Sequence, residues 1–111
     1  MLQEIQLLEE QYRDAHKAWL DAVRVLNELR PKYMAAKEVH DRAHDMHLSL
    51  KEHGYEVEAE ALEPMRLNFE KALAKFAEPY RKADAECRLA DKAAEDCGAR
   101  LEAAKKAADL A

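Results

Sequence analysis

Three histidines in the first half of the chain have the spacing by which a helix presents imidazoles to a metal ion. His40, His44 and His47 lie four and then three residues apart, which places them on one helix face. Imidazoles four residues apart are a common zinc-binding arrangement. The carboxylates that could complete a site of three or four ligands for zinc or another divalent transition metal are Asp41, Asp45, Glu63 and Glu70.

A structural role for the same histidines is the alternative. His40 and His47 fall on the apolar seam described below, where a histidine can pack as a hydrogen-bonded core residue. Protonation of both would charge this seam and loosen it in acid. Because no matching pair of histidines occurs in the second half of the chain, we expect no cofactor, with a transition metal at His40, His44 and His47 as the competing hypothesis.

No catalytic constellation is visible, and we expect that the protein is not an enzyme. Ser49 is the single serine or threonine, and the two glycines do not form a phosphate-binding loop. Cys87 and Cys97 are about 15 Å apart along one helix, which excludes a disulfide between them. Reduced, packed thiols are typical of a cytoplasmic protein.

The histidines belong to a first arm whose apolar residues repeat with the period of a coiled coil. A mostly apolar or small residue recurs at alternating steps of three and four without a phase slip. This seam consists of Ile5, Leu8, Tyr12, Ala15, Trp19, Ala22, Leu26, Leu29, Tyr33, Ala36, His40, Ala43, His47 and Leu50. A period of 3.5 residues kept over this length predicts a long helix packed on another with a left-handed supercoil.

A second arm carries a matching seam, in which Arg66 is the one charged residue. Its members are Ala59, Leu62, Arg66, Phe69, Leu73, Phe76, Tyr80, Ala83, Cys87, Ala90, Ala94, Cys97, Leu101, Ala104 and Ala108. We expect Arg66 either to extend outward past Ala43 or to pair with Asp45 or Glu63.

Glu52-His53-Gly54-Tyr55 is the strongest turn signal between the arms. A turn at Gly54 folds the two seams on each other, so that Tyr12 faces Cys97 and Tyr33 faces Phe76, with large residues mostly opposite small ones. The sequence therefore predicts an all-α fold, an antiparallel helical hairpin or coiled coil. The first arm is expected at about 2–52, the turn at 53–55 and the second arm at 56–110.

Three prolines qualify this prediction. Pro31, Pro64 and Pro79 lie off the seams, so they would kink the arms rather than interrupt the packing. The alternative is that Pro31 starts a new helix and the chain forms a bundle of three or four helices. In either case no linker or repeat is visible, and we expect a single domain over 1–111.

Composition excludes several classes of partner. The chain of 111 residues has a net charge of −5 with both signs interspersed, and 37% of its residues are charged. Without a basic run we expect no nucleic-acid binding. We also expect no membrane association and no secretory signal, because the start is not basic and no long apolar run follows it.

The first arm carries apolar residues outside its seam, whereas the outer face of the second arm is mostly charged residues and alanine. The residues that we expect to contact a partner are Leu20, Val23, Met34, Val39, Met46 and Leu48. Such a surface is either buried in a homodimer that forms a helical bundle or docks on a different protein.

We therefore expect a non-catalytic, cytoplasmic interaction module that acts on a larger protein and self-associates as a homodimer. The heptad pattern resembles, in style alone, small coiled-coil adaptors, secretion chaperones and phage-encoded inhibitors. Two alternatives stay open from the sequence: a metal-binding helical bundle at the three histidines, and a structural coiled coil whose only partner is itself.

Overall fold

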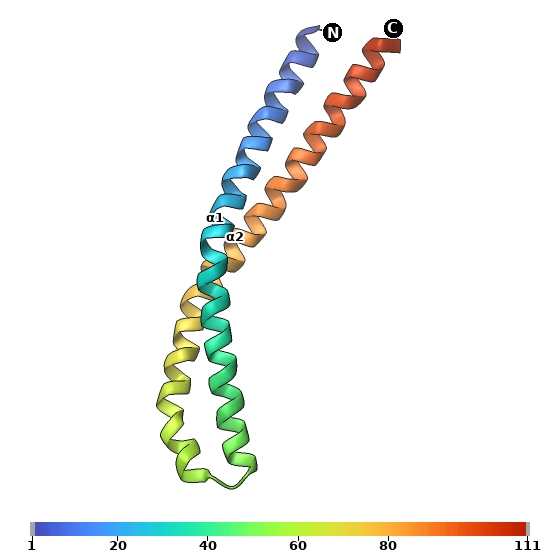
Figure 1. Cartoon of the computed structure of the whole chain (residues 1–111). Helices are drawn as coiled ribbons and strands as arrows, with labels where there is room; N and C mark the ends of the chain where they lie inside the picture. Colours follow the sequence, from blue (N-terminus) through green and yellow to red (C-terminus); the bar gives the residue numbers. More distant parts are fainter. Residues whose placement is uncertain (1, 111) are drawn as a thin grey trace. The chain divides into compact units, whose positions relative to one another are not determined.

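The structure is a computed structural model that describes residues 2–110. Helix α1 spans Leu2–Glu52 and helix α2 spans Glu56–Leu110, and the turn between them holds the remaining described residues (Figure 1). The described part of the chain contains no strand. The predicted all-α helical hairpin is thus confirmed.

The two seams form because the 3.5-residue repeat keeps one side of each helix apolar. Every predicted seam residue except Tyr12 is buried or half-buried, from Ile5 to Ala108. The exposed fraction of Tyr12 is 37%. Helices of this kind owe their stability to packing along such a seam more than to intrinsic propensity, so the seam explains why both helices form.

Gly54 ends α1 with a Schellman motif. Its φ of 81° lies in the left-handed region that favours glycine. The Tyr55 amide donates to the Leu50 carbonyl at 2.8 Å, and the Gly54 amide donates to the Lys51 carbonyl at 3.2 Å. The Tyr55 carbonyl then accepts the first bond of α2, from Ala59 at 2.9 Å. The chain therefore reverses within the few residues where the sequence predicted a turn.

Both helices continue through their prolines. Pro31 lies inside α1, and Pro64 and Pro79 lie inside α2. The alternative in which Pro31 starts a new helix of a larger bundle is therefore wrong. A proline inside a helix costs about 3 kcal/mol, but all three positions lie off the seams, so the packing that stabilises the helices is kept.

The chain divides into two units, each with one segment of each helix. The turn unit is Asn27–Lys82, and the terminal unit comprises the described parts of Met1–Leu26 and Ala83–Ala111. The prediction of a single domain stays a prediction.

Aromatic contacts define which residues meet across each unit. In the terminal unit the Tyr12 ring lies against Gly98, where an added Cβ would be 3.2 Å from Tyr12 Cε2. In the turn unit Tyr33 stacks on Tyr80 with ring centroids 4.5 Å apart. Gly98 directly follows Cys97, the predicted partner of Tyr12, and Tyr80 lies one helical turn after Phe76, the predicted partner of Tyr33. Both contacts lie within one helical turn of the predicted pairs.

The buried core is small. The hydrophobic residues buried in the described chain are Leu26, Ala43, Ala59, Ala77, Ala83, Ala94 and Leu101, and no large side chain is completely buried. In the turn unit this core consists of alanines alone. Most of the larger seam side chains are half-buried.

Candidate functional site

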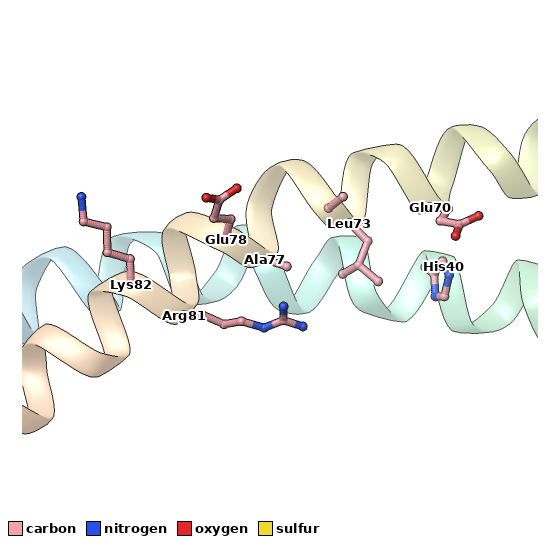
Figure 2. Close-up of a pocket in the computed structure, with 8 residues that line it drawn as sticks. His40, Glu70, Leu73, Ala77, Glu78, Arg81 and Lys82 are labelled. Atoms are coloured by element: carbon pink, nitrogen blue, oxygen red, sulfur yellow. The ribbon is translucent and has the colours of Figure 1, made fainter.

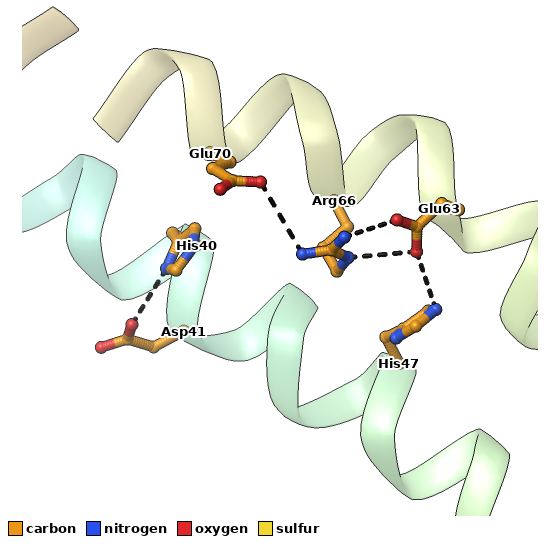
Figure 3. A network of polar contacts seen from close by, with 6 residues as sticks. All are labelled: His40, Asp41, His47, Glu63, Arg66 and Glu70. Carbon is orange, nitrogen blue, oxygen red and sulfur yellow. Dashed lines mark hydrogen bonds and ion pairs between the residues drawn. The ribbon is translucent and has the colours of Figure 1, made fainter. Parts of the chain in front are cut away.

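A polar network in the turn unit joins α1 to α2 around Glu63 (Figure 3). His47 Nε2 lies 2.8 Å from Glu63 Oε2. Arg66 donates from Nε to the same oxygen at 3.1 Å and from Nη2 to Oε1, while its Nη1 lies 3.8 Å from Glu70 Oε2. Glu63 therefore connects a seam histidine of one helix to the seam arginine of the other. Of the expectations for Arg66, pairing with Glu63 is confirmed.

This arrangement lowers the pKa of Glu63 below its ordinary value. The main cause is the hydrogen bond from Arg66; partial desolvation opposes it, and the charges of Arg66, His47 and Lys51 add to it. The hydrogen bond to Glu63 in turn raises the pKa of Arg66. A lowered pKa keeps the Glu63 carboxylate ionised at neutral pH, which favours its hydrogen bonds with Arg66.

The three histidines predicted as metal ligands do not share the same neighbours. His40 stacks on His44 with ring centroids 6.3 Å apart, and its Nδ1 lies 3.1 Å from Asp41 Oδ1. His47 is engaged with Glu63 across the seam. Within residues 2–110, no three His, Cys, Asp or Glu side chains are grouped so that they could hold a metal ion. The metal site at His40, His44 and His47 stays a prediction that gains no support from this geometry.

One side of the seam in the turn unit, here called the charged flank, carries residues of both signs. A groove of about 850 Å³ runs along it (Figure 2), and its lining is His40, Glu70, Leu73, Ala74, Ala77, Glu78, Arg81 and Lys82. A second groove of about 490 Å³ near the turn is lined by His47, Lys51, Glu56, Glu60 and Glu63. The first groove holds two glutamates, an arginine and a lysine, whereas the groove near the turn holds three glutamates and one lysine.

The residues predicted to contact a partner occupy three different places. Leu20, Met34 and Leu48 share one heptad position on the outside of α1, here called the outer row, and are 49%, 54% and 47% exposed. Val39 and Met46 are also exposed but share a different position, beside the seam. Val23 directly follows the seam residue Ala22 and is half-buried.

The other side of the seam in the turn unit is apolar and is built by both helices. A groove of about 390 Å³ is lined there by Lys32, Ala35, Ala36 and Val39 of α1 and by Phe69, Ala72 and Phe76 of α2. Met46 repeats the heptad position of Val39, and Met65 repeats that of Ala72; both methionines are more than half exposed. These positions, Val39, Met46, Met65 and Ala72, are here called the apolar flank.

The contribution of α2 was missed in the sequence. The outer face of the second arm was expected to be mostly charged residues and alanine. Leu67 and Leu89 are exposed there, and Met65 is exposed beside the seam. The signal was the recurrence of Met65 and Ala72 one position before the seam, which is visible once the hairpin pairs them with Val39 and Met46.

The two cysteines are the remaining residues that the sequence singled out. Cys87 and Cys97 are free thiols, and both are half-buried on the seam. No described helix is long and apolar enough to cross a membrane.

Comparison with known proteins assigns no relative. No family model matches the sequence, and neither the curated proteins nor the solved structures include a significant match.

Proposed function

We propose that the protein is a non-catalytic interaction module, a small adaptor, chaperone or inhibitor that docks the part of the outer row in the turn unit on a larger protein. The observation that carries the proposal is the exposure of Met34 and Leu48 at one repeated heptad position of that unit. Large apolar side chains repeated along a helix and left in water are typical of helices that dock in a groove.

The chemistry of the row defines the partner surface. Asp41 occupies the same heptad position between Met34 and Leu48, so this part of the row offers separated apolar anchors with a polar residue between them. Burying one such side chain stabilises a complex by about 1.5–3 kcal/mol. With a net charge of −5 on the chain, a protein groove with a basic rim fits better than nucleic acid.

Affinity purification from the native cell, followed by mass spectrometry, identifies the partner, and its binding is then measured with purified proteins. We expect Met34→Glu to weaken binding by about 30-fold or more, because it places a charge at an apolar anchor. Circular dichroism should show unchanged helicity.

Asn68→Glu is the matched control, since Asn68 is exposed on α2 and the substitution adds the same charge away from the outer row. It should bind like the wild type. Equal affinity of Met34→Glu and Asn68→Glu would remove the outer row from the interface.

A further inference from the structure

The apolar flank of the turn unit is not what a two-helix coiled coil needs. In an isolated pair, the positions on both sides of the seam are typically charged. Here the charged flank follows that rule, whereas Val39 and Met46 of α1 and Met65 and Ala72 of α2 widen the apolar stripe on the other side. A stripe of three positions in seven is the pattern of helices that pack in a larger bundle.

The turn unit also has only a small buried core of its own. Its buried hydrophobic residues are Ala43, Ala59 and Ala77, and Phe69 and Phe76 are only half-buried beside the groove. Beside this small core, Val39, Met46 and Met65 keep 39%, 57% and 52% of their surface exposed.

The order of charged and apolar residues along the flank is self-complementary. The heptad position of the apolar flank is occupied on α1 by Lys32, Val39 and Met46, and on α2 by Glu58, Met65 and Ala72. Because the helices run antiparallel in the hairpin, the lysine lies at one end of the apolar stretch and the glutamate at the other. Both Lys32 and Glu58 are exposed.

We propose that a second copy of this chain covers the apolar flank, with the two copies packed end for end as a four-helix bundle. The two-fold axis lies in the interface, perpendicular to both helices, at the level midway between Lys32 and Glu58. This axis brings the apolar residues of the two copies together and sets the lysine of each copy at the level of the glutamate of the other, as an isologous interface requires. The flank is distinct from the outer row, so this proposal goes beyond the proposed function and can fail without it.

Light scattering coupled to gel filtration, with the full chain and with circular dichroism as a check of helicity, tests the interface. We expect a dimer for the wild type and a helical monomer for Val39→Glu. Asn27→Glu is the control, because Asn27 is exposed on the outside of α1 and the substitution adds the same charge away from the flank. The Asn27→Glu variant should remain a dimer. A monomeric wild type, or a Val39→Glu variant that dimerises as tightly as Asn27→Glu, overturns the proposal.

Charge reversal tests the orientation and separates loss of the interface from loss of the fold. Lys32→Glu alone and Glu58→Lys alone should each weaken dimerisation on the order of tenfold, because each places like charges at the same level at both ends of the interface. An equimolar mixture of the two variants should recover the wild-type affinity, which misfolded chains could not do. A mixture no tighter than either variant overturns the end-for-end docking.

Discussion

Replacing Gly98 by alanine has two opposing effects on stability: a gain in helix propensity and a close contact with the Tyr12 ring. Gly98 lies inside α2, and its φ is not in the left-handed region, since Gly54 is the only described residue there. Alanine therefore fits the backbone and gains about 0.8–1 kcal/mol of helix propensity over glycine. The new Cβ would lie 3.2 Å from Tyr12 Cε2 and 3.5 Å from Cδ2, which is closer than an optimal carbon–carbon separation.

Whether the Tyr12 ring can move decides whether Gly98→Ala stabilises or destabilises the protein. It needs a shift of a few tenths of an ångström, and its exposed fraction of 37% leaves an open side. The steric cost should therefore take up part of the gain, and we expect Gly98→Ala to stabilise the protein by about 0.5 kcal/mol. For a chain of this size, that raises the Tm by about 2–4 °C.

Urea and thermal unfolding at one fixed protein concentration measure the effect, with an unchanged m-value as the sign that stability alone has changed. A double-mutant cycle with Tyr12→Ala isolates the contact. Without the ring, Gly98→Ala should stabilise by close to the full 1 kcal/mol expected from propensity. If Gly98→Ala destabilises the protein in both backgrounds, the contact with Tyr12 is not what limits this position.

Two further predictions concern the seam and the polar network. Leu26 is 6% exposed, so Leu26→Ala should lower the free energy of unfolding by about 2–5 kcal/mol. Leu20→Ala on the outer row should change it by no more than about 0.5 kcal/mol. Similar losses for the two variants in urea unfolding would mean that the seam is not the core. Because the pKa of Glu63 is lowered in the folded state, its contribution is present above the unfolded pKa and is lost as the pH falls through the folded value. The stability advantage of the wild type over Glu63→Gln should therefore shrink in acid urea titrations, and an advantage that grows toward low pH would contradict the network.

The network also changes the expectation for the seam histidines. The sequence places His40 and His47 on the seam and suggests that protonation would put bare charges there. In the structure, the Glu63 carboxylate lies 2.8 Å from His47, so a protonated His47 would form a charge-assisted hydrogen bond. The sequence offered Glu63 and Glu70 only as carboxylates that could complete a metal site with the histidines, and it did not predict the contact between Glu63 and His47.

The sequence by itself predicted the buried face of each helix and the place of the turn, although it left open whether Pro31 starts a new helix. These follow from local physics: a 3.5-residue apolar period has one solution as a helix pair, and Gly54 supplies the left-handed conformation that ends α1. The prolines did not alter this outcome because they lie off the seams.

Only the tertiary structure decided which side chains meet across the seam. The heptad pattern gives the level at which residues of the two helices face each other, but the conformation of each side chain depends on its neighbours. The sequence therefore could not choose Tyr80 as the stacking partner of Tyr33 or Glu63 as the partner of His47. The antiparallel packing also brings Val39 of α1 and Ala72 of α2 to one groove, so the apolar flank is built from two segments distant in sequence.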